Sequence, residues 1–265
     1  MKTKLVMYAI ILILLIAAAV CGFFYFQDHQ AAQEEIKEFT ELRQTYTKVT
    51  DAPVCESSDP TEATIETGLP RVEIDFESLL QINPDTVGWI MIPDTVISYP
   101  VVQTTNNTKY LDLSYGGYQT KAGTLFVNKD NDLETLDSNS IIYGHNMGAG
   151  RYDMFSTLLS YKDEEFLKNH QNIRFDTIYR LHGWWEIFAI IELNVSNTGF
   201  NYQQIHFDDE VEFMEWIIKA KSLSIHETDV EVSSSSHILT LSTCDRSKHG
   251  RNGRLIVLAV RSFNN

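Results

Sequence analysis

The chain has 265 residues, 43% hydrophobic and 22% charged, so it can bury a substantial core and is not a disordered chain. Its formal net charge of -15 and pI of about 4.9 argue against nucleic-acid binding, because binding to phosphates depends on Lys and Arg that displace counterions. The same charge balance argues against adsorption to an anionic membrane surface.

The N-terminus carries an uncharged apolar span from Leu5 to Phe26, and about 20 such residues suffice to cross a bilayer core. Lys2 and Lys4 precede it, so the positive-inside rule predicts a cytoplasmic tip at 1–4, a transmembrane anchor at 5–26 and the rest of the chain outside the cell. A cleaved signal peptide is a weaker alternative, since its apolar region is shorter, about 7–15 residues. A lipoprotein signal at Cys21 is the other alternative, but Val20 stands where that motif needs a small residue.

The segment after the anchor, 27–70, is predicted to be an extracellular helical stalk and linker. Ile36, Phe39, Leu42 and Tyr46 recur every three or four residues, which indicates a helix with one narrow apolar face. Residues 51–70 are rich in Asp, Glu, Ser, Thr and Pro without periodicity, which is typical of a linker. A compact domain is predicted over 71–265.

This domain is predicted to be mainly β with peripheral helices, because many β-branched and aromatic runs alternate with turn residues. Such a pattern favours a barrel or a sandwich. A short helix follows Asp75, which is a plausible cap. Longer helices are predicted over 154–170 and 207–223. The expected strands are "VGWIMI", "TVISYPVVQ", "GTLFVN", "NSIIYGH", "NIRFDTIYRLHGWWEIFAIIELNV", "SHILTLSTC" and "RLIVLAV".

The chain has three cysteines, Cys21, Cys55 and Cys244, and an odd number outside the cytoplasm leaves at least one thiol without an internal partner. Cys55 lies in the polar linker and could form an intermolecular disulfide. Cys244 ends the strand "HILTLSTC", where a thiol at a barrel rim can meet solvent. It is either a small buried hydrophobe or a nucleophile, and a nucleophilic thiolate needs a positive neighbour.

Two residues are candidates for partners of this thiol. His145 ends the apolar strand "SIIYGH" and opens the glycine loop "NMGAG", whereas the other histidines lie in surface segments, in a strand pair or in the solvated loop after Cys244. Arg254 begins "RLIVLAV", and an antiparallel pairing with the preceding strand would place it beside Cys244. A guanidinium stays charged and suits an oxyanion or a backbone carbonyl. Without the other two residues, Arg254 would be an ordinary exposed arginine.

These motifs resemble those of the sortases, which are cysteine transpeptidases of Gram-positive cell surfaces. The resemblance rests on "YGHNM", "TLSTC" and Arg254, and the segments "NPDTVGWI", "YPVVQ" and "NNTKYL" are similar to class B sortases in particular. It covers roughly residues 73–261. It implies a closed eight-stranded β-barrel with N-terminal helices and a long helix, here 208–222, between late strands.

The resemblance also implies a reaction. Cys244 would attack the Thr carbonyl of a C-terminal sorting motif of the NPxTx or SPxTG type on a surface protein, forming a thioester. His145 would protonate the leaving amine and later deprotonate the incoming amine, while Arg254 would hold the substrate backbone and the oxyanion. The acceptor would be an amino group of a peptidoglycan precursor (lipid II) or a pilin lysine.

Substrate binding is expected, by the same resemblance, at Asn107, Leu111, Tyr143 and Ser242. No cofactor and no metal are implied. The alternating residues Asn128, Asp130 and Asp132 faintly resemble a calcium loop, but Leu133 stands where such a loop needs Gly, which favours a solvated acidic loop.

Two other functions compete with a transpeptidase. A surface cysteine protease would use the same three residues with water as the acceptor. A β-rich adhesion module would contain a structural Cys244, and replacing that cysteine would leave surface-protein attachment intact. The apolar anchor and the motif pattern favour the transpeptidase.

Overall fold

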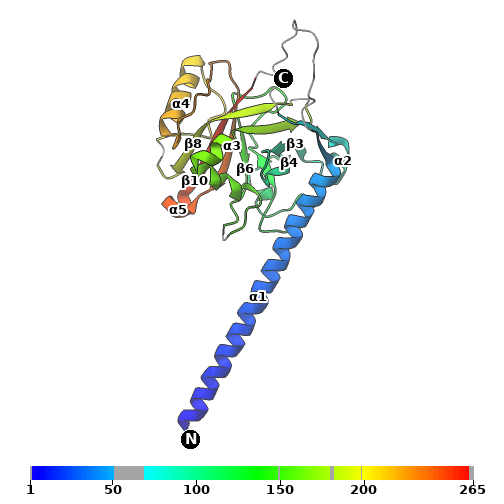
Figure 1. Cartoon of the computed structure of the whole chain (residues 1–265), viewed down its shortest axis with the longest axis vertical. Coiled ribbons are helices and arrows are strands. Elements are labelled where there is room, and N and C mark those ends of the chain that lie inside the picture. The colour runs from blue at the N-terminus through cyan, green and yellow to red at the C-terminus, as the bar shows by residue number, and fades with distance from the viewer. Residues whose placement is uncertain (1, 51–68, 149, 180–181, 198, 263–265) are drawn as a thin grey trace. The chain divides into compact units, whose positions relative to one another are not determined.

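The computed structural model describes residues 2–50, 69–148, 150–179, 182–197 and 199–262 (Figure 1). It divides into two compact units, residues 1–41 and 42–265. The predicted linker and Cys55 lie outside the described residues, apart from positions 69 and 70.

The described part of the first unit is residues 2–41 of the helix α1 (Lys2–Tyr46), and residues 42–46 of that helix belong to the second unit. The predicted anchor and the predicted stalk helix are therefore one continuous helix. Over residues 6–26 its large apolar side chains are exposed, with Leu14 63% and Phe24 60% exposed, which is typical of a helix that faces lipid, whereas Phe39 and Leu42 near its end are buried. Among the described residues it is the one helix that is long and apolar enough to cross a membrane.

The second unit contains a closed barrel of eight strands within the described residues, which confirms the predicted fold class. The order around the barrel is β10-β8-β7-β3-β4-β5-β6-β9. The strands are β3 (Thr86–Met91), β4 (Ser98–Val102), β5 (Leu125–Val127), β6 (Asn139–Tyr143), β7 (Asn172–Thr177), β8 (Trp184–Asn194), β9 (Ile238–Cys244) and β10 (Gly253–Arg261). The helices and 3-10 turns are α2 (Phe76–Ile82), η1 (Lys109–Leu111), η2 (Phe155–Lys162), α3 (Glu164–Asn169), α4 (Glu210–Leu223), α5 (Arg246–His249) and η3 (Gly250–Asn252).

The barrel core is filled by large side chains from these strands. Trp89 of β3, Phe175 of β7 and Trp185 of β8 are all almost completely inaccessible to solvent. Every residue of β3 and β4 is buried, so both faces of these strands are covered. This burial explains why their sequences read as continuous apolar runs rather than as an alternation.

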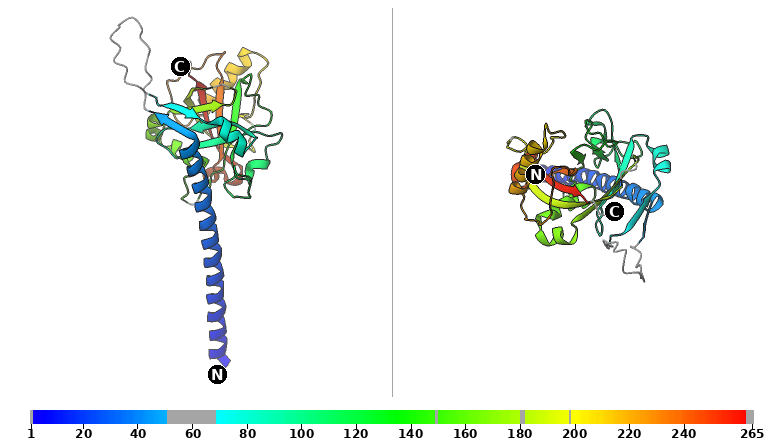
Figure 2. Two further views of the ribbon diagram at one scale, coloured as in Figure 1. Left: turned by 90° about the vertical axis from the view of Figure 1, so that its right-hand side faces the viewer. Right: turned by 90° about the horizontal axis from the view of Figure 1, so that it is seen from above.

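The predicted long helix between late strands is confirmed as α4, which joins β8 to β9 and packs on β8 (Figures 1 and 2). Phe213, Trp216 and Ile217 form one hydrophobic cluster with residues of β8 and β10. The predicted helix over 154–170 is wrong as a single element, because it divides into the 3-10 turn η2 and the short helix α3. Asp163 separates them and caps α3, where its side chain accepts from the N–H of Glu165.

A small sheet that the sequence did not predict precedes the barrel. The strand β1 (Thr47–Thr50) pairs antiparallel with β2 (Arg71–Ile74). The cap predicted at Asp75 is present, since its Oδ1 accepts a hydrogen bond of 3.0 Å from the N–H of Ser78 at the start of α2. Because both strands are short and mostly exposed, their apolar pattern is too weak to be recognised.

Candidate active site

The ends of three neighbouring barrel strands bring the predicted residues together. β9 and β10 pair antiparallel with Arg254 opposite Cys244. β6 and β9 pair parallel with Tyr143 opposite Ser242. His145 comes two residues after Tyr143, as Cys244 comes two residues after Ser242, and both line the same cavity. The consecutive strands β9 and β10 and the sequence-distant β6 therefore bring Cys244, Arg254 and His145 to one rim of the barrel.

A cavity of ≈ 250 Å³ opens at this rim. All seven residues predicted for catalysis and substrate binding line it: Asn107, Leu111, Tyr143, His145, Ser242, Cys244 and Arg254. The other lining residues are Tyr110, Thr124, Phe126, Gly144, Tyr202, Gln203 and Thr243. His249, the histidine closest to Cys244 in sequence, lies in α5 and does not line the cavity.

Cys244 is the last residue of β9, with a free thiol that is partly exposed. Its backbone is held on both sides. The carbonyl of Cys244 accepts a hydrogen bond of 2.8 Å from Asn146 Nδ2, and the N–H of the next residue, Asp245, donates to the carbonyl of Gly253 at 3.0 Å. The thiol therefore projects from a fixed strand end into a solvent-accessible cavity.

The ring of His145 is oriented by a backbone carbonyl. Its Nε2 lies 2.7 Å from the carbonyl oxygen of Leu111, and the backbone carbonyl of His145 accepts from the N–H of Phe155 at 3.0 Å. A carbonyl oxygen can only accept, so Nε2 carries the proton in this hydrogen bond. In the neutral ring, Nδ1 is then the atom that can accept a proton.

Arg254 is partly exposed at the start of β10. Its Nη1 donates to the carbonyls of Arg251 at 3.1 Å and Gly253 at 2.9 Å. Within the described part of the chain, its Nη2 and Nε have no protein acceptor, so these donors are available to a bound molecule. The guanidinium is thus held in place by the turn while part of its donor set stays open.

An ion-pair network supports the loop that follows the thiol. The carboxylate of Asp245, whose side chain is 3% exposed, pairs with Lys162 at the end of η2, and Lys162 also pairs with Glu192 of β8 at 2.8 Å. Burial by itself would raise the pKa of Asp245, but hydrogen bonds from Lys162 and Ser247 outweigh it, and the pKa is lowered. Asp245 is therefore a structural carboxylate that stays ionised.

A second part of the cavity wall, around Tyr143, is joined by side-chain hydrogen bonds. The hydroxyl of Tyr143 accepts from Asn128 Nδ2 at 3.0 Å and from Gln203 Nε2 at 2.8 Å. Asn107 accepts at Oδ1 from the N–H of Lys129, which ties its loop to the same wall. Burial raises the pKa of Tyr143 above its ordinary value, so its hydroxyl stays neutral.

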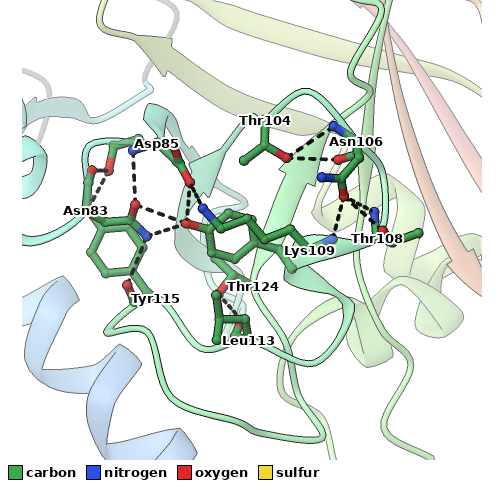
Figure 3. A network of polar contacts seen from close by, with 11 residues as sticks. Asn83, Asp85, Thr104, Asn106, Thr108, Lys109, Leu113, Tyr115 and Thr124 are labelled. Carbon is green, nitrogen blue, oxygen red and sulfur yellow. Dashed lines mark hydrogen bonds and ion pairs between the residues drawn. The ribbon is translucent and has the colours of Figure 1, made fainter.

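A polar network holds the segment that contains Leu111 (Figure 3). Lys109 pairs with Asp85, and the Tyr110 hydroxyl donates to Asp85 at 2.9 Å and accepts from Asn83 Nδ2 at 2.9 Å. The N–H of Thr124 donates to the Tyr110 carbonyl at 3.0 Å. The network therefore holds the first two residues of η1, and the carbonyl of its last residue, Leu111, is the one that orients His145.

Sequence reasoning missed three residues of this wall. Tyr202 and Gln203 lie in the connection between β8 and α4, where no periodicity marks them. Asn128, interpreted from the sequence as part of a solvated acidic loop, is buried and bonded to Tyr143. Tyr202 shares this connection with Phe200, Ile205 and Phe207, so nothing in the sequence distinguishes it as a cavity residue.

Comparison with known proteins points to one family. A family model described as "Sortase domain" matches residues 90–262. Sortase B of Listeria monocytogenes serovar 1/2a is 37% identical over 190 residues, covering 71% of this chain and 74% of that protein. The Staphylococcus aureus sortase B-substrate complex is similar in structure, with a TM-score of 0.65 and 32% identity over 71% of this chain and 84% of that one. Sortase B from B. anthracis in complex with AAEK1 has a TM-score of 0.69 and 29% identity, covering 89% and 98% of the two chains.

Proposed function

Since the chain belongs to the sortase family, as a class B sortase and a cysteine transpeptidase, we propose that Cys244, His145 and Arg254 carry its reaction. The observation that supports these roles most directly is the register that pairs Arg254 with Cys244 at the rim where His145 also lines the cavity. Cys244 is the one thiol at this cavity among the described residues.

In the first step, the proton of the Cys244 thiol passes to Nδ1 of His145, the thiolate Sγ attacks the Thr carbonyl carbon of a C-terminal sorting motif, and the carbonyl electrons move onto oxygen. The backbone N–H of Asp245 is already engaged with Gly253, so it is not a donor to this oxyanion. Arg254 supplies the donors instead through its open Nη2 and Nε, and a positioned donor of this kind is worth about 10²–10³-fold in rate.

Collapse of the tetrahedral intermediate breaks the C–N bond of the motif and leaves a thioester on Cys244. The departing amine takes a proton from Nδ1 of the protonated His145 ring, while Nε2 stays bonded to the carbonyl of Leu111. The amine of the acceptor then enters, loses a proton to the same nitrogen and attacks the thioester carbonyl. Collapse of the second tetrahedral intermediate forms a new amide and breaks the C–S bond, and the departing thiolate takes the proton back from Nδ1, which restores the thiol and the neutral imidazole.

The substrate groove is formed by the four residues predicted from the sequence, with Tyr202 and Gln203 beside them. Asn107, Leu111, Tyr143 and Ser242 contact the motif in this proposal. We assign a motif of the NPxTx or SPxTG type and an acceptor amine on lipid II. A pilin lysine and water are the alternative acceptors, and the experiment below distinguishes them.

The apolar part of α1 anchors the enzyme in the membrane in this proposal. Residues 1–4 lie in the cytoplasm, because Lys2 and Lys4 stay on the inner side. The catalytic domain of residues 71–265 then lies outside the cell, where sortases act and where its protein and peptidoglycan substrates are found.

The proposal is tested with the full chain in detergent micelles and peptides of the NPxTx, SPxTG and LPxTG types. Intact-protein mass spectrometry follows acylation of Cys244, first without an acceptor and then with a peptidoglycan-type amine or a pilin-lysine peptide. We expect an adduct with one of the first two motifs that the peptidoglycan-type amine converts into an amide. Cys244→Ala should show no adduct.

The possible results separate the alternatives. Release of free peptide acid at the same rate with and without an amine would identify a protease. Preference for the lysine peptide would identify a pilin-polymerising enzyme. If no peptide acylates a thiol that reacts normally with a small alkylating reagent, the assignment of Cys244 as the nucleophile is wrong.

A further inference from the structure

We propose that Asn146 is a positioning residue that holds His145 and Cys244 in a fixed relative position. Its side chain replaces the next backbone hydrogen bond between the segment after β6 and β9. This inference rests on the proposed roles of those two residues. It arises from one contact: Asn146 Nδ2 donates to the backbone carbonyl of Cys244 at 2.8 Å, across 98 positions of sequence.

The contact continues the pairing of β6 with β9. In a parallel pair, one strand's N–H groups donate at every second residue to carbonyls two residues apart on its neighbour. The last backbone bond between the two segments runs from the N–H of Gly144 to the carbonyl of Ser242 at 3.2 Å. The next bond in that series would join the N–H of residue 146 to the carbonyl of Cys244, and the Asn146 side chain makes that bond instead.

His145 therefore lies between two closed connections to β9. On one side are the Gly144 to Ser242 bond and a hydrogen bond of 2.8 Å from Thr243 Oγ1 to the Gly144 carbonyl. On the other side is the Asn146 amide. Without that amide, the chain leaving His145 would turn away from β9 at the point where the thiol projects.

Both ends of the Asn146 amide are used. Its Oδ1 accepts from the N–H of Gly148 at 2.9 Å, so the side chain is held in the orientation that points Nδ2 at Cys244. The backbone of Asn146 also forms an isolated bridge with Met154, just before η2. The Asn146 side chain is thus preorganised by its own loop, as a group that sets a distance must be.

The consequence concerns the rate of acylation rather than substrate affinity. Proton transfer to the leaving amine needs the imidazole and the thiol held in one geometry, and a misplacement of about 1 Å can lower a rate by roughly 100-fold. The groove residues are held by separate contacts, such as those of Tyr143 with Asn128 and Gln203. Loss of the Asn146 amide should therefore lower kcat and leave KM almost unchanged.

The test uses the full chain in micelles and the peptide that acylates the wild type best. Asn146→Ala removes both hydrogen bonds, whereas Asn146→Asp keeps an acceptor for Gly148 and loses the donor to Cys244. We expect the single-turnover acylation rate to fall roughly 10- to 100-fold in both variants, with KM within about twofold of the wild type. Thermal unfolding is measured on each variant to confirm that it is folded.

Asn252→Ala is the matched control. It removes an amide hydrogen bond of the same 2.8 Å length, from Asn252 Nδ2 to Ser196, in the loop before β10. That side chain is exposed, and its bond reaches neither Cys244 nor His145. We expect acylation by this variant to match the wild type.

The inference is overturned if Asn146→Asp acylates within about twofold of the wild type, or if KM rises in proportion to the loss of kcat. If Asn146→Ala unfolds, the test rests on Asn146→Asp, because that variant retains the hydrogen bond to Gly148 within its own loop. Failure of the proposed function itself would look different, since the wild type would then form no adduct.

Discussion

Two parts of the cavity are held by different kinds of hydrogen bond, one between backbone groups and the other between side chains. On one side, His145, Cys244 and Arg254 are carried by strand ends whose positions follow from backbone pairing of β6, β9 and β10. On the other side, Asn128, Tyr143 and Gln203 are joined by side-chain hydrogen bonds. The difference indicates that the positions of the three proposed reacting groups depend on backbone register, which changes only in whole steps, whereas the hydrogen bonds of the groove wall can be removed one side chain at a time.

The largest loss of stability and activity is expected from a substitution that disrupts the backbone pairing of β9 with β10. A Cβ on Gly253 would lie 1.8 Å from the carbonyl oxygen of Asp245, so Gly253→Ala must separate β9 from β10 at the Arg254–Cys244 pair. We expect a loss of about 4 kcal/mol or more in the free energy of unfolding, and no detectable acylation. Denaturant titration and the peptide assay measure the two effects.

Gly199→Ala is the control for that substitution, because the nearest atom to its new Cβ is 3.7 Å away, an ordinary contact. Its stability and acylation rate should stay close to those of the wild type. Equal damage from both substitutions would show that the register at Gly253 is not the cause.

Arg254→Ala removes a proposed reacting group without changing the register of β9 and β10. The backbone pairing with Cys244 remains, but the donors for the oxyanion are lost, so we expect kcat to fall about 10²–10³-fold. The midpoint of thermal unfolding should hardly change, since Arg254 Nη1 bonds only to carbonyls of its own turn within the described residues. A comparable loss of stability would instead assign Arg254 a structural role.

On the groove side, Tyr143→Phe should act on binding. The substitution leaves the buried Asn128 amide without this acceptor, at a cost of about 1–3 kcal/mol in stability, whereas the exposed Gln203 amide can bond water instead. We expect KM for the peptide to rise severalfold and kcat to change little. A fall in kcat at constant KM would place Tyr143 with the reacting groups and contradict the division between the two sides.

The smallest effect on stability is expected from the ion pair between Asp245, which follows Cys244, and Lys162. The pKa of Asp245 is lowered in the folded state from the ordinary value of 3.8. Its contribution to stability is therefore complete above pH 3.8 and is lost as the pH falls through the folded-state pKa. Asp245→Asn should be less stable than the wild type at neutral pH, on the order of 1 kcal/mol, because a charge-assisted hydrogen bond from Lys162 is weakened.

The stability difference between Asp245→Asn and the wild type should narrow when denaturant titrations are repeated at progressively lower pH toward 3. A difference that stays constant over that range would show that the ionised carboxylate does not contribute. Glu192 also pairs with Lys162 and remains in this variant, so Lys162 keeps one of its two carboxylate partners.

Much of this site could be predicted from local sequence. The strand that ends at Cys244, the glycine loop after His145 and the arginine that begins the last strand are each visible as short patterns, and all three residues line one cavity. The long helix α4 was also predictable, because its apolar residues follow helical spacing. Asp75 was recognisable as a cap for the same local reason.

Other features depend on contacts between residues far apart in the chain. The apolar stretch 154–170 has helical spacing, yet tertiary packing converts its first half into the 3-10 turn η2 that runs between the backbone of His145 and the carboxylate of Asp245. Asn128 looks like a solvated loop residue until its partner Tyr143 is known.

Local sequence was therefore enough to identify the candidate reacting side chains, the strand ends and the apolar N-terminal helix, since these follow from periodicity and from the chemistry of single side chains. The pairing of β6 with β9, the side-chain rung at Asn146 and the wall formed by Tyr143, Asn128 and Gln203 were set by the closed barrel. The physical reason is that register is a property of two strands together, and nothing within either strand specifies which residue of the other it will face.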